Sequence, residues 1–161
     1  MGKDLQLVGF RIGRETFGVP IHLVREIVRM MEITAVPEAP DYVEGVINLR
    51  GRIIPVIDLR KRFHESGRKA DKRNRILVAE LEGRLVGLVV DAASEVLKIN
   101  PGEIEPPPEL LRENDLSYVT GLGKRNGKLI IMVDVEKLLS RGELGRLTEL
   151  SDWQATAPRY A

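Results

Sequence analysis

The sequence predicts a mainly β protein in which two small barrels pack around a shared core. Three observations support this prediction. The chain has 161 residues, enough for one domain or for two small lobes. Many short β-branched runs are separated by glycines, a pattern more typical of small barrels than of an alternating β–α–β sheet. Two blocks of sequence also recur in the same order, which indicates a duplicated unit.

The N-terminal segment reads as a β-hairpin followed by a mixed element. Residues 5–12 alternate apolar and polar side chains and then break at Gly13, which is a turn signal. Residues 15–21 return as the second strand. In residues 22–30 the aliphatic side chains recur at helical spacing, but their β-branched content favours a strand. We therefore expect a short helix that passes into a strand.

A second hairpin is predicted around the sequence Arg50-Gly51. Residues 45–49 and 52–58 flank this dipeptide, and Gly51 can adopt a positive φ at little steric cost. Pro55 has no backbone N–H to donate, so its strand should be bulged or lie at a sheet edge.

The second half of the chain repeats this organisation. Residues 75–81 and 84–91 pair across Glu82-Gly83, and residues 128–134 form a later strand. Asp58 and Asp134 end matching strands and are predicted to cap short helices, because a carboxylate accepts from first-turn N–H groups. A final amphipathic stretch places Leu144, Leu147 and Leu150 on one helical face.

The internal repeat consists of two ungapped alignments. Residues 15–30 align with residues 84–99, and residues 42–63 align with residues 118–139. Each copy on its own is small for a separate core, so the copies should pack on one another. Matched positions are interpreted as scaffold; the identical pairs include Gly18/Gly87, Glu26/Glu95, Tyr42/Tyr118, Val43/Val119, Gly45/Gly121, Gly51/Gly127, Asp58/Asp134 and Lys61/Lys137.

Composition excludes several classes of protein. There are no cysteines, which rules out thiol catalysis, disulfides and cysteine metal sites. The N-terminus shows no secretory pattern, and no stretch approaches the roughly 20 apolar residues of a membrane span. His22 and His64 lie in different elements, so no metal or cofactor is expected. Gly121–Gly127 lacks phosphate-loop spacing, and no nucleophile motif occurs, which argues against an enzyme.

The charges nearly cancel, with 25 basic and 24 acidic residues. One dense basic segment, residues 67–75, leaves two interpretations open. It is either a solvated loop or the contact region of a nucleic-acid-binding module with an SH3-like or OB-like fold. Such a module would need a net basic face.

The hairpin at Arg50 is where the two copies differ. The sequence "INLRG" in the first copy becomes "GKRNG" in the second, so Arg50 aligns with Asn126. An arginine offers planar, multi-donor recognition of a carboxylate, and Glu26 is a possible internal partner. The alternative is a solvated turn arginine.

The segments "VREI", "VEGVINLRGRIIPVIDLRKRF", "GRLVGLVVDAASEVLKI" and "YVTGLG…GKLIIMVDVEKLL" together resemble the CheW family of chemotaxis coupling proteins. The resemblance runs from about Leu5 to about Leu139. It implies two tandem SH3-like five-stranded β-barrel lobes around a shared core, with short helices and a C-terminal helix. The implied boundaries are a single domain over 1–161, with lobe one at about 14–66, lobe two at about 5–13 plus 74–140, and the helix and tail at about 141–161.

The resemblance also implies a function. Family members are non-enzymatic scaffold adaptors in the cytoplasm, recruited to membrane-associated receptor arrays without direct membrane contact. They link the cytoplasmic hairpin tip of chemoreceptors to the regulatory domain of the histidine kinase CheA. The related CheW-like part of another chemotaxis protein is an alternative, but no catalytic or receiver segment is visible, which favours the stand-alone adaptor.

Site residues are likewise implied by the resemblance. The receptor-side candidates are Val24, Glu26, Ile27, Arg50 and Val96. The kinase-side candidates are Ile76 and Leu77, although the surrounding "RNRILV" matches the family only loosely.

Overall fold

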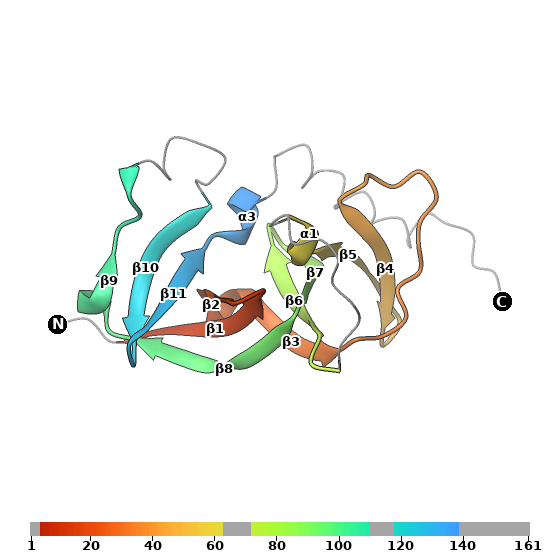
Figure 1. Cartoon of the computed structure of the whole chain (residues 1–161). Coiled ribbons are helices and arrows are strands. Elements are labelled where there is room, and N and C mark those ends of the chain that lie inside the picture. Colours follow the sequence, from red (N-terminus) through yellow and green to blue (C-terminus); the bar gives the residue numbers. More distant parts are fainter. Residues whose placement is uncertain (1–3, 63–71, 110–117, 139–161) are drawn as a thin grey trace.

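The computed structural model describes residues 4–62, 72–109 and 118–138, and within them the chain forms two β-sheets. The first lobe is a five-stranded sheet and the second lobe a six-stranded sheet, and the two lie next to each other (Figure 1). In order across the sheet, the first lobe contains β3 (Val24–Arg29), β6 (Arg75–Leu81), β7 (Arg84–Val90), β5 (Arg52–Asp58) and β4 (Val43–Leu49). The second contains β8 (Ala92–Ile99), β1 (Leu5–Ile12), β2 (Glu15–Pro20), β11 (Lys128–Val133), β10 (Val119–Arg125) and β9 (Ile104–Glu105).

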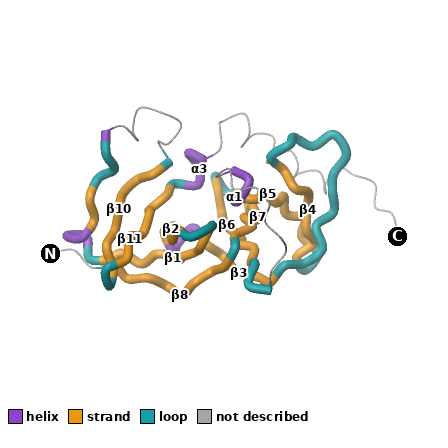
Figure 2. Tube along the Cα trace, viewed as in Figure 1, coloured by secondary structure: helices purple, strands orange, loops and turns teal. Residues whose placement is uncertain are grey.

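Helical segments among the described residues are short (Figure 2). They are η1 (Ile21–Leu23), α1 (Leu59–Arg62), η2 (Pro101–Glu103) and α3 (Val135–Leu138). The predicted mainly β fold with paired SH3-like lobes is confirmed, with β9 as a sixth strand in the second lobe. The mixed element is also confirmed, because η1 passes directly into β3. The amphipathic stretch from Leu144 to Leu150 and most of the basic segment lie outside the described residues.

The two sequence repeats exchange their N-terminal hairpins. The β1–β2 hairpin precedes the first lobe in the chain, yet it pairs with β8 and β11 of the second lobe. The β6–β7 hairpin pairs instead with β3 and β5 of the first lobe. Each sheet is therefore made of strands from both repeats.

This exchange corrects the expected lobe boundaries. Residues 75–90 belong to the first lobe rather than the second, and β2 joins β1 in the second lobe. The physical reason is the length of the connections. Only η1 separates β2 from β3, and only Asp91 separates β7 from β8, so the chain crosses between sheets at both points.

Equivalent residues of the two repeats pair with each other's equivalents in the two sheets. In the parallel contact between β5 and β7, Val56 pairs with Gly87. In the equivalent contact between β11 and β2, Met132 pairs with Gly18. These are the residues that the two alignments equate, so the duplication extends to the hydrogen-bond ladders.

At two of the scaffold positions, the structure shows a steric reason why the residue is glycine. Gly45 has a φ of 149°, and a Cβ at this position would lie 2.2 Å from the carbonyl oxygen of Thr34. That close approach lets Thr34 form a bridge to Val46 beside β4. Gly51 has a φ of 88° in open space, where it permits the tight turn between β4 and β5.

Pro55 does not lie on an edge strand, but the other expectation, a bulge, agrees with the register shift between Val43 and Gly45 in the ladder of its strand to β4. Its strand, β5, is flanked by β7 on one side and β4 on the other. The ladder to β7 begins only at Val56, so Pro55 itself has no partner residue there. A central strand therefore accommodates the proline at the position just before the second ladder starts.

The main core lies between the lobes, with smaller clusters inside each. This shared core combines residues of both sheets, including Phe10, Phe17, Leu77, Leu88 and Val133, and Phe10 stacks on Phe17 at a ring-centroid distance of 5.7 Å. Tyr42 and Tyr118 pack against it, as expected for the aligned tyrosines. The first lobe's own cluster contains Ile47, Leu49, Ile54, Val56, Ile76, Val78 and Val89. The second lobe's contains Leu7, Leu97, Ile99 and Ile130.

A polar network crosses from one lobe to the other beside α1. The backbone N–H of Arg60 donates to Asp58 Oδ1 at 2.9 Å, as predicted for a helix cap. The Arg60 guanidinium also contacts Asp58 Oδ2 at 2.9 Å and Asp91 Oδ1 at 3.5 Å. Asp91 Oδ2 accepts from Gly13 N–H of the second lobe at 2.7 Å. These contacts add directional polar bonds to the apolar contact between the lobes.

Candidate functional site

Arg50 and Glu26 form an ion pair at the tip of the β4–β5 hairpin. Arg50 Nη2 donates to Glu26 Oε2 of β3, and the two side chains are 69% and 32% exposed. The hydrogen bond from Arg50, reinforced by its charge, lowers the pKa of the Glu26 carboxyl, and the same contact raises the pKa of Arg50. The possible internal partner of Arg50 is therefore confirmed.

Asn48 has a structural role in this turn. Its Oδ1 accepts the backbone N–H of Gly51 at 2.8 Å, which ties the strand end to the turn. Arg50 itself has a φ of 53°, in the left-handed region. Asn126, its counterpart in the β10–β11 hairpin, has a φ of 51°. The backbone is thus the same in both lobes, and only the side chain differs.

Three of the predicted receptor-side residues lie along the open edges of the shared core. Ile27 of β3 pairs with buried Leu77, and Val96 of β8 pairs with buried Val8. Directly paired residues point to the same face of a sheet, so Ile27 and Val96 extend the shared-core face outward. Val24 also packs against this core.

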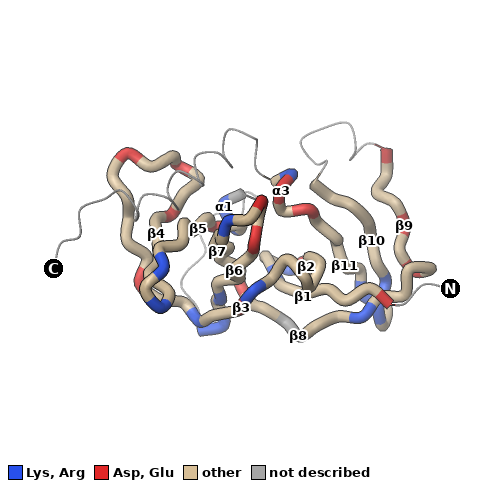
Figure 3. The backbone as a smooth tube through the Cα atoms, turned by 180° about the vertical axis from the view of Figure 1, so that it is seen from behind, with Lys and Arg blue, Asp and Glu red and all other residues tan. Residues whose placement is uncertain are grey.

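We call this strip the seam, defined by Val24 and Ile27 of β3 and Ala93 and Val96 of β8. Ile27 is 41% exposed and Val96 44%, which is unusual for large aliphatics on a core-facing side. Both strands are sheet edges, and both views place them along the same side of the molecule, away from α1 and α3 (Figures 1 and 3). The seam is therefore an accessible apolar strip between the lobes.

The ion pair lies on the other face of β3. Glu26 pairs with Val78, which belongs to the first lobe's own core, whereas Ile27 pairs with Leu77 of the shared core. The structure thus brings Val24, Ile27 and Val96 onto one face. Glu26 and Arg50 lie on the opposite face of the edge strand β3, next to that strip.

Ile76 and Leu77 do not form a surface. Both side chains have 0% exposure, because β6 lies between β3 and β7 and carries core residues on both faces. This corrects the expectation for these two residues, since a side chain without accessible area cannot contact a partner. The apolar sequence around Ile76 and Leu77 indicated a strand, but it did not indicate that both faces of this strand would be buried.

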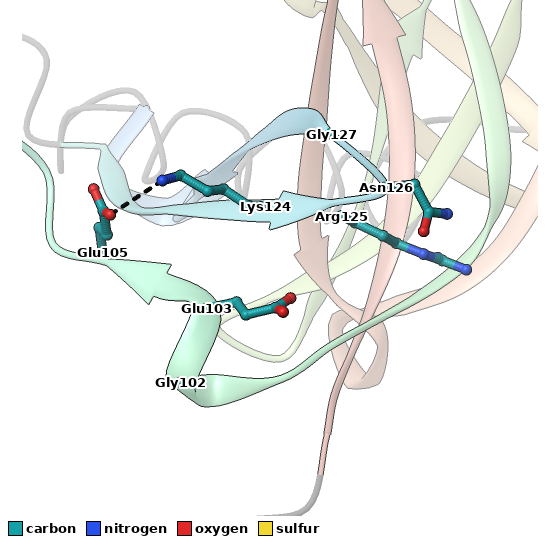
Figure 4. A pocket seen from close by; sticks show the side chains of 7 residues that line it. All are labelled: Gly102, Glu103, Glu105, Lys124, Arg125, Asn126 and Gly127. Atoms are coloured by element: carbon teal, nitrogen blue, oxygen red, sulfur yellow. Dashed lines mark hydrogen bonds and ion pairs between the residues drawn. The ribbon is translucent and has the colours of Figure 1, made fainter.

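A charged cavity that the sequence did not reveal lies in the second lobe between η2, β9 and the β10–β11 turn (Figure 4). Its volume is about 390 Å³, and it is lined by Gly102, Glu103, Glu105, Lys124, Arg125, Asn126 and Gly127. Lys124 Nζ contacts Glu105 Oε1 at 3.3 Å, and Arg125 Nη1 is buried with no hydrogen-bond partner among the residues that the structure describes. The turn joins two strands rather than preceding a helix, so a phosphate loop is excluded here, as the sequence indicated.

Among residues 4–62, 72–109 and 118–138, no group of histidines and carboxylates is arranged to bind a metal ion. Within the same residues, no helix has the length and apolar character needed to span a bilayer. The accessible features of this part of the chain are therefore the seam, the Arg50–Glu26 pair and the charged cavity.

Comparison with known proteins identifies the fold and the family. Residues 6–143 match the CheW-like domain. The chain is 40% identical over 135 residues to chemotaxis protein CheW of Klebsiella aerogenes, covering 84% of this chain and 81% of that protein. It is also 40% identical over 138 residues to chemotaxis protein CheW of Helicobacter pylori, covering 85% and 82%.

A solved structure agrees with these sequence matches. The crystal structure of the scaffolding protein TtCheW from Thermoanaerobacter tengcongensis superposes with a TM-score of 0.74 and 43% identity. The match covers 83% of this chain and 90% of that one. Because the family model covers most of its length and both the sequence relatives and the solved structure agree with it, the chain belongs to the CheW family of chemotaxis proteins.

Proposed function

We propose that the chain is a non-enzymatic scaffold adaptor that couples the cytoplasmic tips of chemoreceptors to the histidine kinase CheA. In this role it works in the cytoplasm and joins receptor arrays through its partners rather than through the membrane. Membership of the CheW family supports this proposal, together with the description of a solved relative as a scaffolding protein.

The seam is the observation that favours a receptor-binding role most. A helix can dock by laying its apolar side against an apolar strip, and the exposed Ile27 and Val96 provide such a strip. The edge strands β3 and β8 leave room for it, since no further strand covers them within the described residues. We assign the receptor helix tip to the seam, with Val24, Ile27 and Val96 as contacts.

Arg50 and Glu26 are assigned to the rim of the same site. The Arg50 side chain is largely exposed and carries further N–H donors besides the one bonded to Glu26. A receptor carboxylate could therefore be held by Arg50 while Glu26 keeps its guanidinium in place. The kinase contact is assigned to the ends of the barrels, which would meet the homologous barrels of the CheA regulatory domain.

The test is a binding titration with a chemoreceptor hairpin-tip fragment and, separately, with a CheA regulatory domain. Micromolar-range affinity, roughly 8 kcal/mol, is expected for each. Ile27→Glu and Val96→Glu should weaken receptor binding at least tenfold, because each places a charge in an apolar contact. Leu129→Glu is the matched control, since Leu129 is 47% exposed on β11, outside the seam. Absence of binding to both partners by the unmodified chain would refute the proposal.

A nucleic-acid-binding module is not favoured by the family membership. The basic segment that suggested it, residues 67–75, lies mostly outside the described residues. A gel shift at low salt tests it directly, because phosphate binding is strongest there.

A further inference from the structure

The seam carries a basic residue at each of its two outer ends. β3 begins at the crossing from η1 and runs outward to Arg29, while β8 begins after Asp91 and runs outward through Lys98. The two arrows diverge along the same side of the molecule, as Figure 1 shows. The repeat equates Arg29 with Lys98, so the two positive charges are related in the same way as Ile27 and Val96.

Register places these side chains on the seam face. Side chains two residues apart in a strand share a face. Arg29 follows Ile27 by two residues, and their partners in β6, Arg75 and Leu77, keep the same spacing. Lys98 is two residues beyond Val96 in the same way. Exposure agrees, because Ile27 and Arg29 are both exposed, and so are Val96 and Lys98.

Neither positive charge, on Arg29 or on Lys98, is held in an ion pair among the described residues. Arg29 also lies directly opposite another arginine, a cross-strand arrangement that is unfavourable in an isolated sheet. Arg75 is held there by its bonds to the carbonyl oxygens of Lys72 and Asn74, each at 2.8 Å. An acidic partner would relieve this repulsion.

We propose that the seam selects a partner helix whose apolar centre is flanked at both ends by acidic residues, which Arg29 and Lys98 recognise. This inference rests on the proposed receptor-binding function and specifies which helices the site prefers. Each basic residue lies two strand positions, about 6.6 Å, beyond its aliphatic neighbour. One helical turn is about 5.4 Å, so the matching acids should lie about one turn outside the apolar contacts.

The experiment uses the full chain and two versions of one chemoreceptor hairpin-tip fragment. One version carries glutamate one turn beyond the apolar contacts at both ends, and the other carries lysine there. Dissociation constants are measured by calorimetry at low salt and at high salt. The chain variants are Arg29→Glu, Lys98→Glu and the double variant. Lys137→Glu is the control, because Lys137 is an exposed cation on α3, away from β3 and β8 in Figure 1.

The unmodified chain should prefer the glutamate version at low salt. Each reversal should weaken binding of that version about 3- to 10-fold, and high salt should reduce the difference, since exposed charges are screened. The double variant should prefer the lysine version, and Lys137→Glu should behave as the unmodified chain. Circular dichroism checks that every variant is folded.

Three results would overturn the inference, and they are distinguishable. If the fragment binds but the reversals leave its affinity and charge preference unchanged, the flanking charges have no role and the receptor-binding proposal survives. If neither fragment version binds the unmodified chain at either salt, the proposed function fails and the inference fails with it. Charge-dependent binding to vesicles of anionic lipid, without binding to the fragment, would also refute it in favour of a lipid surface.

Discussion

Arg50 occupies a position where the backbone conformation alone would favour another residue. Its φ of 53° is readily adopted by asparagine, which stands at the same place in the second lobe as Asn126. An arginine with this backbone is less favourable, so its presence is best explained by its side chain. The ion pair with Glu26 and the remaining guanidinium donors supply that reason.

The first prediction compares the two turns. Arg50→Asn should raise the thermal unfolding midpoint slightly while weakening receptor binding, because it relieves the turn and removes the guanidinium. Asn126→Arg, the reciprocal change, should destabilise the fold by about 1 kcal/mol. Thermal and chemical denaturation measure the stability of both variants, and a binding titration measures the receptor affinity of Arg50→Asn. A lower stability of Arg50→Asn would show that the Glu26 contact outweighs the turn preference.

The second prediction concerns pH. Arg50 lowers the pKa of the Glu26 carboxyl, so the pair contributes stability above the ordinary glutamate pKa. That contribution is lost as the pH falls through the lowered pKa. NMR titration of the Glu26 carboxyl should therefore give a lowered pKa that returns to an ordinary value in Arg50→Asn. An equal pKa in both proteins would mean that the pair does not form in solution.

Sequence reasoning at this scale succeeded where the signal was local and failed where it depended on neighbours. The difference between "INLRG" and "GKRNG" drew attention to Arg50, and Glu26 was named as a possible partner that the structure then confirmed. The burial of Ile76 and Leu77 could not be foreseen, because it depends on two clusters assembled from distant strands, the first lobe's own core around Ile76 and the shared core around Leu77. The charged cavity in the second lobe was missed for a similar reason, since η2 and the β10–β11 turn are distant in sequence.

At the scale of elements, hairpins and caps followed from local chemistry. The turns at Gly13 and Gly51 and the Asp58 cap are where the sequence predicted them. An edge position was one of two expectations for the strand of Pro55 and is wrong, because sheet position is decided by strands far away in sequence. Its missing N–H is tolerated in a central strand only because the ladder to β7 starts at the next residue.

The third prediction separates two roles of Asp58. This side chain is 7% exposed and both caps α1 and binds the Arg60 guanidinium. Asp58→Asn keeps an oxygen that can cap the helix but removes the charge, whereas Asp58→Ala removes both. Asp58→Ala should cost about 1 kcal/mol more than Asp58→Asn in urea unfolding, the usual value of a cap. Equal losses would show that the charge, not the cap, dominates.

For the whole molecule, the repeat was visible in the sequence but the exchange of hairpins was not. Alignment shows which segments are equivalent, and it says nothing about which copy each segment pairs with. The pairing is dictated by short crossings at η1 and Asp91, whose spatial course emerges only in three dimensions. The shared apolar core was nevertheless expected, since neither copy is large enough to bury its own apolar face.

The fourth prediction follows from this exchange. Separate fragments covering residues 1–66 and 67–161 should each be largely unfolded, because each lacks two partner strands for its hairpin. Mixed together, they should regain the β-sheet signal in circular dichroism and bind the receptor fragment. A fragment of 1–66 that folds cooperatively alone would contradict the exchanged arrangement. A mixture with one fragment carrying Gly45→Ala serves as the control and should not assemble, because of the clash with Thr34.

The parallel contact between Phe17 and Ile131 has a consequence during synthesis of the protein. A ribosome releases roughly 5–20 residues per second, so the opening hairpin waits on the order of ten seconds for the strand beside it. During that interval its Phe10 and Phe17 rings, later hidden, face water or a chaperone. All five strands of the first lobe have been made once Val90 is translated, but the second lobe cannot close until β11 emerges, so premature termination late in the message would release a polypeptide prone to aggregate.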